Sequence, residues 1–218
     1  MPNVVRAAML AVMALLFGAC GTYVQTQVTA FHSLPPGVAG KRFVMVPYKD
    51  QQDSLEWRSY SDLVASKLES KGFVRAEQLN GADLAVFMVY AIDGGRTSVS
   101  AVPMYGQTGG GTTTTTTGYV GSTPVYGSTY TPPTYGITGY APVESTVYGR
   151  AVKITILDVP ASYSQKKGVP VYEATATSAG SNGTLNVVMP AIVDGIFKDW
   201  PGPSGATRTV TTPLSTTK

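Results

Sequence analysis

The sequence predicts an α+β domain: a mostly antiparallel sheet of about five to six strands, two amphipathic helices on one face, and a long flexible hairpin insertion. Three observations predict this class. Six segments have the two-residue alternation or the β-branched and aromatic content of strands, and two segments repeat apolar residues every three or four positions. A further segment, residues 105–141, has neither pattern and interrupts the strands.

The predicted strands are separated by turn-forming residues. The most apolar run, residues 82–92, is followed by Asp93-Gly94-Gly95. Because Asp-Gly suits a tight hairpin turn, residues 96–104 are expected to fold back antiparallel on this run. The six predicted strands cover residues 23–31, 42–48, 82–92, 96–104, 145–159 and 170–178.

Two amphipathic helices are expected to pack on the sheet. For the first, Asp53 with Glu56 is a candidate N-terminal cap, and Gly72 offers a left-handed residue after the last turn. The second is expected to begin after Thr184 and to end before Trp200. The apolar stripes are Trp57, Tyr60, Val64 and Leu68 in the first helix, and Leu185, Val188, Ile192 and Ile196 in the second.

The insertion of residues 105–141 contains six consecutive threonines, Thr112 to Thr117, and no charged residue. With few aliphatic side chains it is expected to remain a flexible, solvated loop. The alternative is an uncharged surface that binds a glycan, peptidoglycan or a protein partner, because tyrosine offers apolar area and a hydroxyl group. The candidate partner-binding residues are Tyr105, Tyr119, Tyr126, Tyr130, Tyr135 and Tyr140.

The N-terminus has the layout of a secretory signal peptide. Arg6 precedes eleven apolar residues, Ala7 to Phe17, which as a helix would rise roughly 16 Å against a hydrocarbon core of about 30 Å. The following Gly18-Ala19-Cys20 completes a segment that resembles the lipobox of bacterial lipoproteins, in which the cysteine becomes the lipid-bearing first residue. Phe17 departs from the leucine preferred there. The alternative is ordinary cleavage after Ala19, which would leave Cys20 as a free thiol.

These boundaries predict three parts of the chain. Residues 1–19 are a lipoprotein signal peptide, residues 20–202 a single α+β domain, and residues 203–218 a loose C-terminal tail. Within the tail, Thr207 to Val210 could add a short edge strand.

The charge pattern excludes nucleic acid as a partner. Charged residues make up 13% of the chain and the net charge is +3, which becomes +2 when Arg6 leaves with the signal. Lysine and arginine form no stripe of the kind that displaces counterions from a phosphate backbone. The membrane, reached through acylated Cys20, and an envelope protein or glycan are the expected partners.

The sequence offers no catalytic constellation and no metal or cofactor site. His32 is the only histidine and Cys20, expected to carry lipid, is the only cysteine. A zinc site needs three or four ligands, which these residues do not supply. Ser164 and Lys167 match the spacing of a serine–lysine motif, but they stand in a predicted polar loop rather than at the start of a helix.

The order of elements and several turn motifs resemble a bacterial lipoprotein family known as domain of unknown function 4136. The motifs are Leu68 to Phe73 (LESKGF), Ala82-Asp83-Leu84, and Met189-Pro190 continued by Ile196 to Gly202 (IFKDWPG). The resemblance covers most of residues 22–202 apart from the insertion. It implies a lipid-anchored envelope domain and supplies no catalytic residues.

The sequence therefore predicts a lipid-anchored envelope protein that is not an enzyme and acts by binding or assembly. Gly21 stands where aspartate would signal inner-membrane retention, so by resemblance to lipoprotein sorting we expect an outer-membrane protein facing the periplasm. Two alternatives remain open. One is an envelope hydrolase acting on a cell-wall or lipid substrate, for which Asp83 and Asp158 are the residues to substitute. The other is a lipid carrier with an apolar cavity between the helix of residues 185–199 and the sheet.

Overall fold

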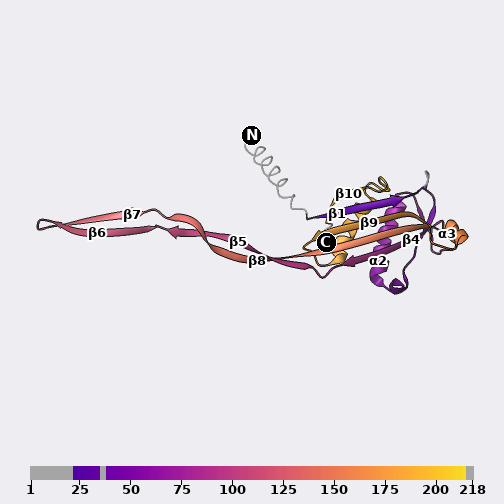
Figure 1. Ribbon diagram of the computed structural model, residues 1–218, viewed down its shortest axis with the longest axis horizontal. Coiled ribbons are helices and arrows are strands. Elements are labelled where there is room, and N and C mark those ends of the chain that lie inside the picture. The colour runs from indigo at the N-terminus through magenta and orange to yellow at the C-terminus, as the bar shows by residue number, and fades with distance from the viewer. Residues whose placement is uncertain (1–21, 35–37, 215–218) are drawn as a thin grey trace, which may run out of the picture. The chain divides into compact units, whose positions relative to one another are not determined.

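The structure is a computed structural model that describes residues 22–34 and 38–214 (Figure 1). The predicted signal peptide and Cys20 lie outside the described residues. The chain divides into two compact units: the first runs up to Gly95 and resumes at Val147, and the second comprises Arg96 to Thr146. The units are described separately below.

The first unit is built on a sheet with strand order β10-β1-β9-β8-β4-β2-β3, to which β5 is added by pairing with β8. Strands β1, β9 and β10 alternate buried and exposed side chains, so one face of the sheet carries the main core. Their bounds are β1 Tyr23–His32, β2 Arg42–Met45, β3 Val74–Arg75, β4 Leu84–Ile92, β8 Thr134–Asp158, β9 Pro170–Gly180 and β10 Thr207–Pro213, with β5 at Arg96–Gly109.

The predicted antiparallel sheet of five to six strands with two helices is wrong. The sheet has eight strands and is mixed, since β2 pairs in parallel with both β3 and β4, and the described residues contain three α-helices. The parallel pairing follows from the connection, because the chain crosses from β2 to the neighbouring strands through helix α2 (Leu55–Ser70). The segment β10, within the expected loose tail, pairs antiparallel with β1.

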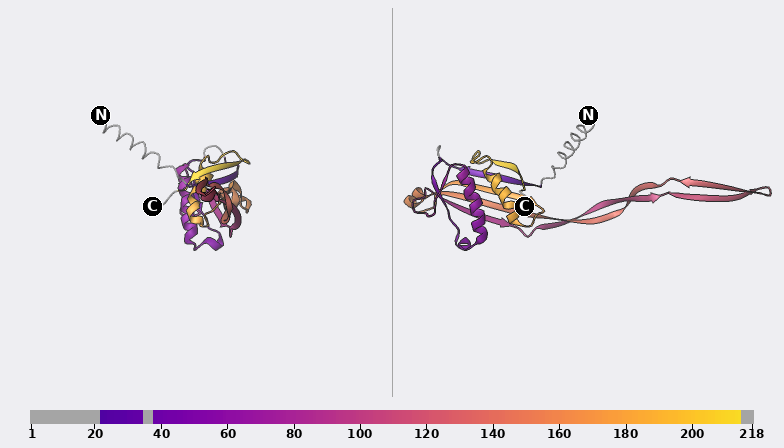
Figure 2. Two further views of the ribbon diagram at one scale, coloured as in Figure 1. Left: turned by 90° about the vertical axis from the view of Figure 1, so that its left-hand side faces the viewer. Right: turned by 180° about the vertical axis from the view of Figure 1, so that it is seen from behind.

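Helices α2 and α4 (Leu185–Phe197) lie next to each other over one face of the sheet (Figure 2). Both apolar stripes predicted from the sequence are buried there. The ammonium group of Lys67 on α2 lies 2.5 Å from a carboxylate oxygen of Asp194 on α4. The N-cap of α2 is Ser54, whose hydroxyl accepts a hydrogen bond from the N–H of Trp57, so the expected cap at Asp53 is one residue too early.

The opposite face of the sheet carries a smaller apolar cluster at one end, beside a short helix, α3 (Val159–Gln165), that the sequence did not predict. Asp158 caps α3 by accepting a hydrogen bond from the N–H of Ala161 at 2.8 Å. Pro160 stands in its first turn, where a missing N–H costs nothing. The helix ends at Lys166, which has a left-handed backbone (φ 53°). The polar loop predicted for residues 164–167 is thus the end of a helix.

The second unit is a ribbon of paired strands, called the ribbon below and defined as residues 96–146. The outer hairpin joins β6 (Thr112–Val120) to β7 (Thr123–Thr131) as an antiparallel pair, and β5 pairs with β8 (Figure 1). The prediction of a flexible insertion over residues 105–141 is therefore wrong in its secondary structure. Backbone pairing replaces the missing apolar core, and β-branched threonine suits an extended backbone.

The hairpin predicted at Asp93-Gly94 is also wrong. β4 pairs with β8 from Leu84 opposite Asp158 to Ile92 opposite Arg150, and β5 pairs with β8 instead of turning back on β4. Gly95 has a left-handed backbone (φ 77°), which supplies the bend between the two strands without a strand reversal.

Candidate functional site

The register of the outer hairpin gathers three of the candidate tyrosines on one face of the ribbon. Tyr126 is opposite Thr117 and Tyr130 is opposite Thr113, while Tyr119 has the same parity on β6 as these two threonines. Residues opposite each other, or two apart on one strand, share a face of an antiparallel pair. Tyr119, Tyr126 and Tyr130 therefore project from the same face, which is called the tyrosine face below.

The three side chains of the tyrosine face are strongly exposed, at 77%, 75% and 60% for Tyr119, Tyr126 and Tyr130. Tyr119 is opposite Pro124, two residues from Tyr126, so the two tyrosines are diagonal neighbours about 7–8 Å apart at their α-carbons. The other face of the hairpin carries threonine, glycine and valine. The sequence predicted the tyrosines as candidates, but only the register shows which of them share a face.

The other three candidate tyrosines are also exposed but are not brought into this face. Tyr105 lies on β5, and Tyr135 and Tyr140 lie on β8, each more than 60% exposed. The odd separation of Tyr135 and Tyr140 places them on opposite faces of a regular strand. Of the six candidate tyrosines, three therefore share the tyrosine face and the other three are dispersed over β5 and β8.

The backbone edges of the outer hairpin are unpaired. β6 and β7 form a sheet of two strands, so each strand has one edge without a hydrogen-bonded neighbour among the described residues. None of residues 97–143 is charged, and none of residues 96–146 is buried. Proteins usually protect exposed edges with lysine, proline or a covering segment, because free N–H and C=O groups pair readily with another strand.

The residues considered for catalysis have structural partners instead. His32 is half-buried, and its Nε2 lies 2.9 Å from the carbonyl oxygen of Gly202. The carboxylate of Asp83 accepts a hydrogen bond from the N–H of Arg42 at 2.7 Å, and the carboxylate of Asp158 caps α3. Over residues 22–34 and 38–214 there is no group of three or more His, Cys, Asp or Glu residues placed to hold a metal ion.

Arg150 is a buried cation that the sequence did not single out. One guanidinium nitrogen donates to the carbonyl oxygens of Gly180 and Asn182, and the other to the hydroxyl of Ser178. Burial lowers the pKa of Arg150, and the charge of Asp93 opposes that effect. The side chain therefore ties β8 to the end of β9 and to the segment that leads into α4.

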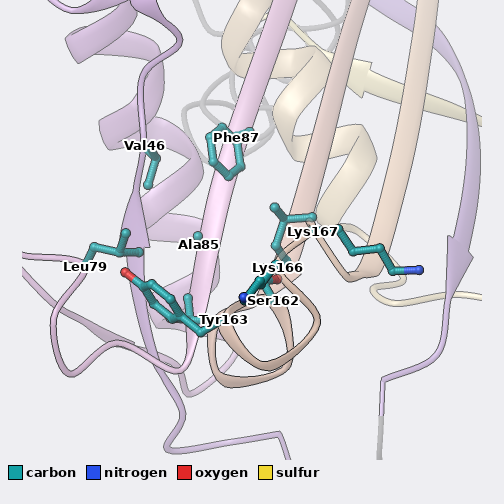
Figure 3. A pocket seen from close by; sticks show the side chains of 10 residues that line it. Val46, Leu79, Ala85, Phe87, Ser162, Tyr163, Lys166 and Lys167 are labelled. Carbon is teal, nitrogen blue, oxygen red and sulfur yellow. The ribbon is translucent and has the colours of Figure 1, made fainter.

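An apolar cavity of about 450 Å³ lies on the face of the sheet opposite α2 and α4. Ala85 and Phe87 of β4 and Leu157 of β8 contribute to it from the sheet, and Tyr163 contributes from α3 (Figure 3). The cavity expected for a lipid carrier, between residues 185–199 and the sheet, was predicted on the other face. There the apolar side chains of α4 are buried against β1, β9 and β10. The sequence could have indicated a second apolar face, because residues 82–92 are apolar on both faces of their strand and only one face is covered by α2 and α4.

No helix among the described residues has both the length and the apolar character needed to cross a membrane.

The fold and the candidate site define a mixed-sheet domain with two helices on one face and an uncharged strand ribbon that carries a tyrosine face. Residues 27–202 match the family described as Domain of unknown function (DUF4136), and the chain belongs to this family. This membership confirms the family resemblance drawn from the turn motifs, whereas the lipid anchor that the resemblance implied stays a prediction.

Solved structures with a similar arrangement are distant. A PDZ domain protein from Parabacteroides distasonis is 13% identical with a TM-score of 0.41, over 91% of this chain and 41% of that one. The chain thus spans less than half the length of that protein. A PelC dodecamer from Paraburkholderia phytofirmans is 16% identical with a TM-score of 0.35, over 77% of this chain and 91% of that one. No curated protein sequence matches the chain.

Proposed function

We propose that this chain is a lipid-anchored, non-enzymatic protein of the cell envelope that binds a protein partner through the ribbon. One observation carries the proposal. Between Arg96 and Glu144 the ribbon has no charge, its hairpin strands β6 and β7 each have an edge with no paired strand among the described residues, and none of its side chains is buried. A solvent-exposed surface without lysine, glutamate or aspartate lacks the usual protection against strand pairing.

The unpaired edges favour recognition by strand addition. In this mode an extended partner segment hydrogen-bonds to the free N–H and C=O groups of an edge strand, and side-chain contacts on alternate residues supply specificity. The edge of β6 offers nine residues, Thr112–Val120, and six of them are threonines. Their β-branched side chains favour the extended conformation that such pairing needs.

The tyrosine face supplies the second half of the interface. Tyrosine gives a large contact area at low cost in side-chain entropy and keeps a hydroxyl group for hydrogen bonds. Tyr119 and Tyr126, as diagonal neighbours, form a pair of exposed rings next to the edge of the hairpin. A partner strand added to the edge of β6 would lie beside Tyr119, and Tyr126 on β7 extends the same face one strand further in.

The proposed anchor is Cys20, three residues before β1 begins at Tyr23. Three residues reach at most about 10 Å, so a lipid on Cys20 would hold this end of the sheet against the membrane surface. Thr22 and Leu214 lie at this end, where the N–H of Leu214 donates to the carbonyl of Thr22 at 2.8 Å. We place the anchor in the outer membrane with the domain facing the periplasm.

Incorporation of radiolabelled palmitate tests the anchor. The parent chain should take up the label and a Cys20→Ala variant should not. Equal labelling of the two chains would contradict acylation at Cys20, and no labelling of either would favour cleavage after Ala19 with a free thiol.

A charge placed on the edge of the hairpin tests the binding mode. In the double variant Thr114→Lys and Thr116→Lys, two ammonium groups stand on one face of β6 opposite Thr129 and Gly127, which are uncharged. We expect the full chain, crosslinked in native membranes and purified, to lose its partner. The control is Thr114→Gln with Thr116→Gln, which introduces long polar side chains without the charge and should keep the partner.

Two results would contradict this binding mode. Retention of the partner by the lysine variant would exclude pairing at this edge. Recovery of a glycan in place of a protein would show that the tyrosines bind sugar, and the ribbon would then be a carbohydrate-binding element.

A further inference from the structure

We propose that the cavity beside α3 binds one long acyl chain bearing an anionic headgroup, with the hydrocarbon inside the cavity and the headgroup at Lys166 and Lys167. The proposal concerns the first unit and goes beyond the binding role proposed for the ribbon.

The walls of the cavity require an apolar occupant. The side chains of Val46, Ala85, Phe87 and Leu157 line it from the strands and their extensions, and Leu79 lines it from a loop (Figure 3). Its volume of about 450 Å³ falls within the roughly 300–1,000 Å³ of small-molecule sites in proteins.

The hydroxyl group of Ser162, which also lines the cavity, already has hydrogen-bond partners within the protein. The hydroxyl of Ser162 bonds to the carbonyl of Asp158 and accepts a hydrogen bond from the N–H of Val169. Among the described residues, the buried side-chain polar atoms without a partner all belong to residues outside this cavity. A polar group carried inside by a ligand would lose its hydration without gaining a partner, so the buried part must be hydrocarbon.

The mouth of the cavity carries positive charge. Lys166 and Lys167 line it and are exposed, and neither has an ion-pair partner among residues 22–34 and 38–214. Figure 3 shows Lys166 beside Ser162 and the ammonium group of Lys167 directed outward. A lysine stem turns freely, so both ammonium groups can meet an anionic headgroup at the entrance.

The occupant is a molecule other than the proposed lipid of the anchor. Phe87 of the cavity is in register with Thr155, Glu173 and Phe31 across the sheet. Phe31 lies eight residues along β1 from Tyr23, a distance of about 27 Å. The cavity is therefore at the end of the sheet away from Tyr23, where β1 begins.

Photolabelling of the full-length chain in isolated membranes tests the site, with palmitate that carries a diazirine on its terminal carbon. We expect label on the peptides that contain Phe87 and Leu157. Unlabelled palmitate should compete better than palmityl alcohol, which has the same chain without the charge. Competition by a lysophospholipid instead of palmitate would identify a phospholipid as the source of the acyl chain.

Two variants with matched controls separate binding from folding. Val46→Phe fills the cavity, and Val89→Phe makes the same change on the same sheet face outside it. Lys166→Gln with Lys167→Gln removes the charges at the mouth, and Lys71→Gln with Lys198→Gln removes two exposed charges elsewhere.

Both cavity variants should lower labelling about tenfold. Val46→Phe removes the space for the acyl chain, and the lysine variant removes the charge-assisted contacts with its headgroup. Both control variants should be labelled as strongly as the parent chain. Protease resistance of each variant in the same membranes reports folding. If Val46→Phe does not fold, the comparison of the lysine variant with its control still tests whether the cavity binds an anionic acyl chain. Label spread evenly over the surface, or equal labelling of the lysine variant and its control, would overturn the proposal.

Discussion

The carboxylate of Asp93 accepts a hydrogen bond from the backbone N–H of Gly149, with 2.8 Å between Oδ1 and N. The same oxygen accepts a bond from the N–H of Gly95 at 3.0 Å, and the N–H of Asp93 donates to the carbonyl of Gly149 at 2.9 Å. Asp93 follows the last residue of β4, and Gly149 is its neighbour on β8. These bonds close the β4–β8 ladder where β4 ends.

Gly149→Ala should destabilise the first unit. A β-carbon at Gly149 would lie 2.7 Å from Oδ2 of Asp93, so the carboxylate must move and its bonds weaken. We expect a loss of about 1–3 kcal/mol in the free energy of unfolding, measured by urea titration. Gly94→Ala is the control, because nothing lies within 4 Å of its added β-carbon. Equal stability of the two variants would contradict a structural role for this contact.

Arg150→Met should be more destabilising than loss of a surface ion pair. It leaves the carbonyls of Gly180 and Asn182 without this donor, at a cost of about 1–3 kcal/mol. The comparison is Lys153→Met, which breaks a 3.2 Å pair with Glu173 between half-exposed side chains, for which we expect less than about 1 kcal/mol. Urea titration of both variants gives the difference. A smaller loss of unfolding free energy for Arg150→Met than for Lys153→Met would contradict the conclusion that Arg150 holds β8 to the end of β9.

The fold should lose stability at alkaline pH. Burial raises the pKa of Tyr172 to about 12, compared with about 10 in an unfolded chain. The folded state thus favours the neutral phenol, so its contribution is complete below about pH 10 and is lost as the pH rises through about 12. Burial raises the pKa of Tyr60 and Tyr90 as well, and they act in the same direction.

Tyr172→Phe isolates one part of this pH dependence. The variant has no phenol to ionise at this position, so its unfolding free energy should fall less between about pH 10 and pH 12. The hydroxyl of Tyr172 is buried and has no hydrogen-bond partner of normal geometry among the described residues, so we expect no loss of stability at neutral pH. Parallel pH profiles for parent and variant would show that Tyr172 ionises as easily in the folded state as in the unfolded chain.

Gly110→Ala should disrupt the ribbon where the hairpin of β6 and β7 begins. Gly110 has a left-handed backbone (φ 69°), and an added β-carbon would lie 1.9 Å from the carbonyl oxygen of Pro132. Gly121→Ala is the matched control, since Gly121 has a similar φ of 67° but open space around it. Hydrogen exchange of the amides of residues 112–131 should accelerate much more in the Gly110 variant. Equal exchange in both variants would mean that the contact with Pro132 does not position the hairpin.

The parts of the fold that the sequence predicted are those with strong local periodicity. The stripes of α2 and α4 and the alternation in β1 and β9 place side chains correctly because one face of each is buried. Strand pairing is not local. Asp93-Gly94 has the composition of a tight turn, yet β4 pairs with β8, since the long apolar run needs a partner along its whole length.

The parallel pair of β2 and β4 could have been predicted. A strand, a helix and a second apolar strand in succession favour a crossover connection, which makes the two strands parallel. The sequence predicted a hairpin insertion but not its paired strands, because the threonines and glycines have no apolar period and are typical of solvated loops. Its tyrosine face depends on the register, with Tyr126 opposite Thr117, and composition carries no information on register.

Site-specific photocrosslinking tests the binding role of the ribbon most directly. A benzophenone amino acid is placed at Thr115, in the middle of β6, or at Thr175, an exposed position on β9 in the first unit. After irradiation of intact cells, we expect the chain with the probe at Thr115 to form a discrete adduct with one envelope protein, and the chain with the probe at Thr175 to form none. Absence of an adduct at Thr115, or the same adduct from both positions, would contradict the proposal that the ribbon is the partner-binding element.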